Sequence, residues 1–120
     1  MTEQKAVVER YADGFRTGDL AKILSCLADD VVWAQHDSKT LAGKAAFAVE
    51  ADTPDAPKPE RTMDRLVEDG DMVAAVGHGR VALGDGDPAE FVYTEVFTFT
   101  DGLVSRLDTF HIWLSGVPAA

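Results

Sequence analysis

The sequence predicts a single α+β domain over residues 1–120, in which a curved antiparallel β-sheet wraps around helices near the N-terminus. Three observations lead to this class. Apolar residues near the N-terminus recur with helical spacing, residues beyond position 60 alternate with the two-residue period of strands, and two Asp-Gly pairs are typical of hairpin turns. The expected element order is α-α-β-α-β-β-β-β. Because so few helices cannot fill the concave side of a strongly bent sheet, an internal pocket facing the first helix is also expected.

The first two helices are predicted from apolar stripes and from capping residues. A helix over roughly residues 3–17 carries Val8, Tyr11, Ala12 and Phe15 at helical spacing, and Gly18 stands just past its end. Asp19 is placed to cap a second, short helix. Its apolar stripe consists of Leu20, Ile23, Leu24 and Leu27, and Ala28-Asp29-Asp30 closes it.

The middle of the chain contains the remaining helix and the first strands. Residues 31–35 are β-branched and aromatic and predict a short strand, which a loop over 36–39 and a helix over 43–50 follow. Residues 53–60 hold three prolines in eight positions, so an exposed loop or flap is expected there. Strands over 61–68 and 72–83 flank a turn at Asp69-Gly70, and residues 84–88 lead to the last hairpin.

The last hairpin provides the main prediction about chemistry. Asp101-Gly102 predicts a type I′ turn, which places Thr100 opposite Leu103, Phe99 opposite Val104 and, further out, Glu95 opposite Asp108. Two carboxyls that face each other among aromatic rings would share a proton, with one pKa raised toward neutrality, as a general acid or base requires. A three-residue loop would instead put Glu95 and Asp108 on opposite faces of the sheet.

Composition argues against several classes of partner. The chain has 11 Lys and Arg against 21 Asp and Glu, and its net charge of −10 disfavours binding to nucleic acid or to an anionic membrane. The N-terminal residues form no signal peptide and no segment is apolar enough to span a bilayer, so a cytoplasmic location is predicted. Cys26, the single cysteine, lies in an apolar run and is expected to be a buried structural thiol.

Four segments resemble one known superfamily. They are Val8–Leu20, Leu27–Trp33, Asp69–Val73 and Phe97–Arg106, and together they span nearly the whole chain. The chain resembles the nuclear transport factor 2-like superfamily, in its SnoaL-like and ketosteroid isomerase-like branch. The resemblance implies a cone-like sheet with an internal pocket, but it leaves the reaction open, because this superfamily includes isomerases, cyclases, dehydratases, epoxide hydrolases and proteins that only bind ligands.

The resemblance also implies site residues. Tyr11 matches the oxyanion-hole tyrosine of ketosteroid isomerases, and Glu95 matches the carboxylic acid that these enzymes keep protonated. Their general base has no counterpart, because its position falls near Gln35 and His36, with Asp37 adjacent. Asp108 matches an acid in the last strand of SnoaL-like cyclases and of limonene epoxide hydrolase-like proteins.

Other residues are expected to bind substrate around these three. Arg80 resembles the arginine of the epoxide hydrolase site, although Ala82 stands where that site has an aspartate, and His78 shares the face of Arg80. His36 is expected at the pocket mouth, His111 is expected to point away from the pocket, and aromatic walls are expected from Trp33, Phe97 and Phe110. The histidines form no metal motif and no phosphate loop is present, so neither a metal nor a cofactor is predicted.

Two functions of different classes follow. In the first, the chain is a cofactor-independent enzyme that isomerises, cyclises or dehydrates an apolar carbonyl compound, with Asp108 moving the proton and with Tyr11 and protonated Glu95 stabilising an enolate. In the second, the same cavity belongs to a noncatalytic ligand-binding or dimerisation module. A homodimer packed sheet to sheet is predicted from the outer face, to which Thr94, Val96, Thr98, Leu107 and Thr109 are assigned.

Overall fold

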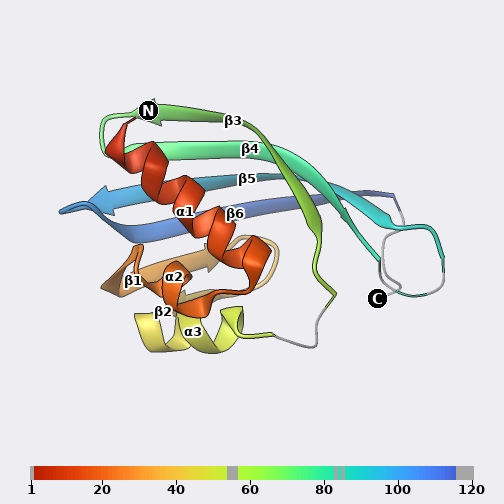
Figure 1. The fold of residues 1–120 in the computed structure, drawn as a ribbon, viewed down its shortest axis with the longest axis horizontal. Coiled ribbons are helices and arrows are strands. Elements are labelled where there is room, and N and C mark those ends of the chain that lie inside the picture. The colour runs from red at the N-terminus through yellow and green to blue at the C-terminus, as the bar shows by residue number, and fades with distance from the viewer. Residues whose placement is uncertain (1, 54–56, 83, 85, 116–120) are drawn as a thin grey trace.

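The computed structural model describes residues 2–53, 57–82, 84 and 86–115, and its fold is the predicted α+β class (Figure 1). Helix α1 spans Glu3–Thr17, as predicted, and α2 spans Leu20–Leu24, which begins where predicted but ends before Leu27. Both are defined by caps: the Thr2 side chain accepts from the backbone N–H of Lys5, and Asp19 accepts from that of Lys22. Gly18 ends α1 with φ 70°, a left-handed conformation that favours glycine.

The strands form one six-stranded sheet in the order β2-β1-β6-β5-β4-β3. Their bounds are Leu27–Gln35 for β1, Thr40–Ala42 for β2, Glu60–Asp69 for β3, Met72–Val81 for β4, Ala89–Thr100 for β5 and Leu103–Ser115 for β6. The sequence did not predict β2, and it assigned the start of β1 to the end of the second helix. The sheet is mixed and not wholly antiparallel as predicted, because β1 pairs with β6 in parallel.

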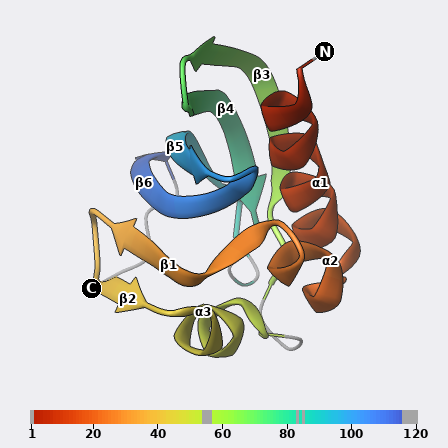
Figure 2. The same cartoon turned by 90° about the vertical axis from the view of Figure 1, so that its left-hand side faces the viewer.

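The sheet curves around the helices (Figure 2). Helices α1 and α2 lie on one side of it, and α3, which spans Lys44–Ala51, lies beside the edge formed by β1 and β2. The main core lies between α1 and the concave face and includes the fully buried Val8, Phe47, Phe97 and Leu107. Beyond the helices, Phe91, Tyr93 and Val81 form a second, smaller core with Trp113.

The structure has a hairpin turn at both places that the sequence predicts, but only the turn at Asp101-Gly102 agrees in position and type. Asp101 and Gly102 both have positive φ, 52° and 82°, as a type I′ turn requires. The turn between β3 and β4 is Gly70-Asp71, one residue later than predicted, because Asp69 pairs with Met72. Gly70 has φ 60° at the first central position, which glycine adopts without steric cost.

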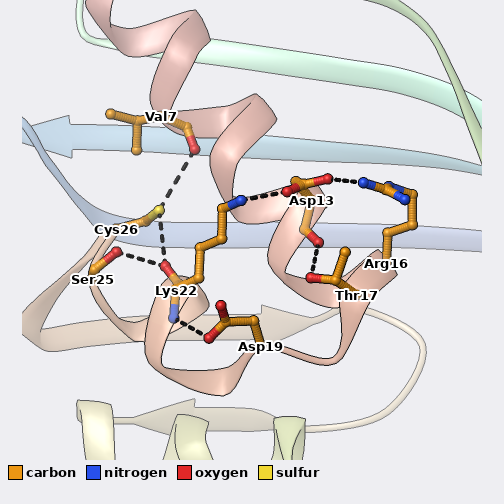
Figure 3. Close-up of polar contacts among 8 residues, drawn as sticks. All are labelled: Val7, Asp13, Arg16, Thr17, Asp19, Lys22, Ser25 and Cys26. Atoms are coloured by element: carbon orange, nitrogen blue, oxygen red, sulfur yellow. Dashed lines mark hydrogen bonds and ion pairs between the residues drawn. The ribbon is translucent and has the colours of Figure 1, made fainter.

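Polar contacts stabilise the corner between α1 and α2 (Figure 3). Asp13 pairs with both Arg16 and Lys22, which lowers the pKa of its carboxyl. The Cys26 Sγ lies 3.5 Å from the carbonyl oxygen of Lys22, and burial raises the pKa of this thiol, as expected for a structural cysteine. The corner therefore fixes α2 against α1. In the part of the chain that the structure describes, no helix is long and apolar enough to cross a membrane.

Candidate functional site

A cavity of about 680 Å³ opens between α1, α2 and the concave face of the sheet. Four of the predicted site residues line it, namely Tyr11, Trp33, Glu95 and Phe97. Phe15, Ile23, Met63 and Tyr93 extend the apolar wall, and charged side chains including Arg16 and Lys58 belong to the same lining. The cavity therefore combines an apolar interior with a few polar groups, as small-molecule sites commonly do.

Glu95 is the buried carboxyl of this cavity. It is 8% exposed and points inward from β5, between Tyr93 and Phe97 on the same face. The hydroxyl of Thr109, which lies directly opposite on β6, donates to Glu95 Oε2 at 3.1 Å. The indole N–H of Trp33 in turn donates to the Thr109 hydroxyl at 3.0 Å. This chain of hydrogen bonds, which extends from β1 through β6 to β5, fixes the orientation of the Glu95 carboxyl.

The protonation of Glu95 is set mainly by burial. Burial in apolar surroundings disfavours the charged form and raises the pKa of this carboxyl, while Arg61 and the hydrogen bond from Thr109 lower it by less. Glu95 is consequently able to exchange a proton closer to neutral pH than an exposed glutamate. This property is typical of general acids and bases.

Tyr11 contributes a hydroxyl to the same cavity. It is buried on α1, and its ring contacts Phe15 and Phe97 edge to face, with centroids 5.0 and 5.2 Å away. Burial raises the pKa of the phenol, and the nearby Glu95 raises it further. Tyr11 thus remains a hydrogen-bond donor over the physiological range.

Arg61 is a cavity residue that sequence reasoning missed. Its Nη1 lies 3.7 Å from Glu95 Oε1, and its guanidinium lies over the rings of Phe91 and Tyr93, 5.6 and 5.0 Å from their centroids. Gly77 on β4 leaves room for the Tyr93 ring on which the guanidinium lies, because a Cβ at position 77 would lie 2.6 Å from the Tyr93 hydroxyl. Strand alternation places Arg61 on the same face of β3 as Met63, which also lines the cavity. The sequence near Arg61 does not show that this face is the concave one.

The predicted pairing of Glu95 with Asp108 is wrong. Thr100 does pair with Leu103 and Phe99 with Val104, but the next pair is Thr98 with Arg106, so Ser105 is an extra residue on β6. This β-bulge shifts the register by one, and Asp108 lies opposite Val96 on the outer face. Leu107 and Thr109 therefore face inward and not outward as predicted.

Asp108 belongs to a separate polar cluster outside the cavity. Arg106 donates to it at 3.0 Å, and His36 Nε2 lies 2.9 Å from the same carboxylate oxygen. Burial alone would raise the pKa of Asp108, but the hydrogen bonds from Arg106 and His36 outweigh it and lower the pKa. The His36 ring stacks on Phe110, with centroids 4.4 Å apart. His36 and Phe110 thus lie with Asp108, away from the cavity lining.

The two predicted β4 residues also lie outside the cavity lining. His78 Nδ1 is 2.8 Å from Asp64 and Arg80 Nε is 3.1 Å from Glu60, and both side chains are largely exposed. His111, which was predicted to point away from the pocket, instead shares the inner face with Tyr93 and stacks on Phe91. The same bulge that displaces Asp108 explains this difference.

Solved structures with the same fold include a protein of unknown function, an epoxide hydrolase and a protein crystallised with a small molecule. An NTF2-like protein of unknown function from Burkholderia pseudomallei is 23% identical, with 92% of this chain and 91% of that chain covered and a TM-score of 0.82. An LEH-like epoxide hydrolase of M. tuberculosis is 19% identical, with 92% and 83% covered and a TM-score of 0.81. TerC, co-crystallised with polyporic acid, is 23% identical, with 91% of each chain covered and a TM-score of 0.80.

The sequence itself matches a family model. The model describes the SnoaL-like domain and matches residues 8–107, which include most of α1, all of α2, the cavity residues on β3 and β5 and the start of β6. No curated protein sequence matches the chain. Because the family model covers most of the chain and the solved structures share its fold, this protein belongs to the SnoaL-like family of the nuclear transport factor 2-like superfamily.

Proposed function

We propose that this protein is a cofactor-independent enzyme that binds an apolar carbonyl compound in the cavity and moves a proton with Glu95. The observation that carries the proposal is a buried carboxyl with a raised pKa in an aromatic cavity, held by Thr109 and accompanied by the Tyr11 hydroxyl. A noncatalytic apolar site gains nothing from an ionisable group at this depth, because burying one costs free energy. Perturbed carboxyls in cavities are accordingly candidates for acid–base work.

The proposed chemistry begins with proton abstraction. Ionised Glu95 takes a proton from the carbon next to the ligand carbonyl, and the electron pair of the broken C–H bond moves onto the carbonyl oxygen to give an enolate. The Tyr11 hydroxyl donates a hydrogen bond to that oxygen as its negative charge develops. Where the enolate is conjugated with a C=C bond, the acid form of Glu95 returns the proton to the far carbon of that bond, which completes an isomerisation. Where the ligand has a second carbonyl, the enolate carbon attacks its carbon, the C=O π pair moves onto the oxygen, and that oxygen takes the proton from Glu95 to become a hydroxyl, which completes a cyclisation.

The relatives support a small-molecule ligand without defining it. TerC, which has the same fold, was crystallised with polyporic acid, and another neighbour is an epoxide hydrolase. These identities are too low to transfer a reaction to this chain. Asp108 is not included in the proposed mechanism, because it lies on the face of the sheet opposite Glu95.

Exchange of ligand protons with solvent tests this function. Candidate enolisable ketones are incubated with the protein in D₂O, and deuterium incorporation next to the carbonyl is followed by NMR. Glu95→Gln is expected to lower the exchange rate by roughly 10²-fold or more, since it removes the proton-transfer group. Asp108→Asn is the control and should leave the rate unchanged. Equal rates for wild type and Glu95→Gln with every ketone that binds would contradict the proposal.

The second candidate is a noncatalytic ligand-binding module with the same cavity. The position of Asp108 favours this candidate. Asp108 lies on the other face of the sheet, so among the described residues Glu95 has no second buried carboxyl beside it with which to share a proton. The two candidates differ in one outcome. A module binds the carbonyl compound but leaves its protons unexchanged, whereas the enzyme does both.

We also propose that two copies pack through the outer face of the sheet. Phe110, Ile112 and Leu114 on β6 are exposed large apolar residues, and Val92 and Val96 on β5 are half-buried on the same face. Exposed apolar patches of this kind on a sheet often mark interfaces. The cytoplasmic location remains a prediction, and the free thiol of Cys26 is consistent with it.

A further inference from the structure

We propose that Arg61 selects ligands that carry an anionic oxygen on a planar apolar frame, such as an aromatic carboxylate or an ionised enol. The inference rests on the proposed function in one respect, because it takes the cavity to be the ligand site. It adds the class of substrate and a residue that determines specificity.

Arg61 is positioned by aromatic rings and forms no hydrogen bond with a carboxylate among the described residues. Cation–π contacts with Phe91 and Tyr93 position the guanidinium, and these contacts engage its face and not its N–H groups. The distance of 3.7 Å to Glu95 exceeds that of a hydrogen bond. Among the described residues, no side chain or carbonyl accepts a hydrogen bond from Arg61. Its N–H donors therefore remain available to a ligand.

Two other arginines on the sheet provide the contrast. Arg80 donates to Glu60 at 3.1 Å, and Arg106 donates to both oxygens of Asp108 at 3.0 to 3.2 Å. Each has a carboxylate within hydrogen-bond distance, and each lies outside the cavity lining. Arg61 alone of these three lines the cavity, and its nearest carboxylate is held at a greater distance.

Arg61 also places a positive charge inside a strongly acidic protein. The chain carries a net charge of −10, so its overall field repels anions, and an anionic ligand needs a local cation to bind. Arg61 supplies that charge beside Glu95, and Lys58 also belongs to the cavity lining. Asp13, an acid of the same lining, is already paired with Arg16 and Lys22. Glu9 and Asp52 also belong to the lining, so its bases Arg16, Lys58 and Arg61 do not outnumber its acids. An anionic ligand would therefore depend on the placement of Arg61 next to Glu95 and not on a net positive cavity.

The apolar wall of the cavity is largely aromatic. The rings of Tyr93, Phe97 and Tyr11 line the cavity around Glu95, and aromatic surfaces of this kind favour flat ligands. In its acid form, which burial favours and which proton abstraction also produces, Glu95 does not repel an anionic oxygen and donates a hydrogen bond to it. A planar acid therefore satisfies Arg61, Glu95 and the aromatic wall together, whereas a neutral hydrocarbon leaves the guanidinium unpaired.

A matched pair of probes tests the inference. The ligands are 2-naphthoate and the neutral 2-naphthamide, and binding is followed by quenching of Trp33 fluorescence in a Trp113→Phe background, which leaves Trp33 as the remaining one of two tryptophans. Wild type is expected to bind naphthoate about tenfold more tightly than naphthamide, as one charge-assisted pair allows. Arg61→Gln should abolish this preference while leaving the affinity for naphthamide nearly unchanged.

Two further variants make the result specific. Arg61→Lys should restore part of the preference, because it returns the charge without the planar fork. Arg80→Gln removes an equal charge outside the cavity lining and should keep the full preference. Equal affinities for the two probes in wild type, or a preference that survives Arg61→Gln, would overturn the inference while leaving a cavity ligand site intact. If neither probe quenches Trp33, the inference fails together with the cavity as the ligand site.

Discussion

Glu95 and Asp108 lie on opposite faces of the sheet, although the turn between their strands is the one that the sequence predicts. The cause is Ser105, the extra residue of a β-bulge on β6. Its hydroxyl donates to the carbonyl oxygen of Thr98 at 3.2 Å and accepts from Thr100 at 3.0 Å. The extra residue Ser105 thus determines which side chains of β6 face the cavity. As a result Glu95 lies in the buried cavity, whereas Asp108 lies on the outer face beside Arg106.

Deletion of Ser105 is expected to be tolerated. Phe99 pairs with Val104 and Thr98 pairs with Arg106 on either side of the bulge, so removing the extra residue leaves a regular ladder with the same faces. The cost should be about 1–2 kcal/mol from the lost hydrogen bonds and the altered strand bend. Urea unfolding measures this cost, and cross-strand NOEs between residues 95 and 109 check the register.

Deletion of Thr94 is the matched control. It lies in the regular part of β5, where removal of one residue turns the preceding side chains to the wrong face. We expect this variant not to fold. A Ser105 deletion that also fails to fold, or that brings residues 95 and 108 into register, would refute this account of the bulge.

The two carboxyls are expected to titrate independently. NMR of the side-chain carboxyl carbons should show Glu95 titrating above its reference pKa of about 4.3 and Asp108 below its reference of about 3.9. Arg61→Gln should raise the pKa of Glu95 further, because it removes the nearby cation. Asp108→Asn should leave the pKa of Glu95 unchanged. A change in that value would mean that the two groups share a site after all.

The same shifts give opposite pH dependences of stability. Glu95 has a raised pKa in the folded state, so its contribution to stability declines as pH rises from the unfolded value through the folded value. Asp108 has a lowered pKa, so its contribution is present above the unfolded value and is lost as pH falls through the folded value. Urea unfolding at a series of pH values measures the free energy of unfolding. Compared with wild type, this free energy should fall less with rising pH in Glu95→Gln, and it should fall less with decreasing pH in Asp108→Asn.

Local signals in the sequence were sufficient for the helices and the hairpin turns. Gly18, Asp19 and Asp101-Gly102 each specify a backbone conformation through their own chemistry, and the structure has a cap or turn at each. Tyr11 and Glu95 were likewise placed correctly in the cavity lining, since a helical stripe and strand alternation both depend on neighbours in sequence.

Non-local features could not be predicted in this way. The parallel pairing of β1 with β6 joins segments far apart in the chain. The bulge at Ser105 has no glycine or proline to mark it, and it reversed the predicted faces of Asp108, Thr109 and His111. Arg61 enters the cavity only because the sheet curves. A candidate site whose residues are brought together by the pairing register of two strands is therefore harder to predict from sequence than the strands themselves.

Gly77 should be intolerant of even one methyl group. A Cβ at this position would meet the carbonyl oxygen of Thr62 and would lie 2.6 Å from the Tyr93 hydroxyl, and the carbonyl is part of the backbone of β3. Gly77→Ala is expected to cost about 1–3 kcal/mol through overpacking. Gly86→Ala, where nothing lies within 4 Å, should change stability by less than about 0.5 kcal/mol. Equal urea midpoints for the two variants would contradict the close packing of Tyr93 against β4.

The outer face of the sheet should be the surface through which two copies associate. Ile112 is 61% exposed on β6 between Phe110 and Leu114, so a charge at this position would have to be desolvated in a sheet-to-sheet dimer. Wild type is expected to elute at dimer mass in size exclusion with light scattering, and Ile112→Asp at monomer mass. Val49→Asp is the control, because Val49 is 79% exposed on α3, away from that face, and should leave the dimer intact. A wild type that stays monomeric at high concentration, or an Ile112→Asp variant that stays dimeric, would exclude this face as the interface.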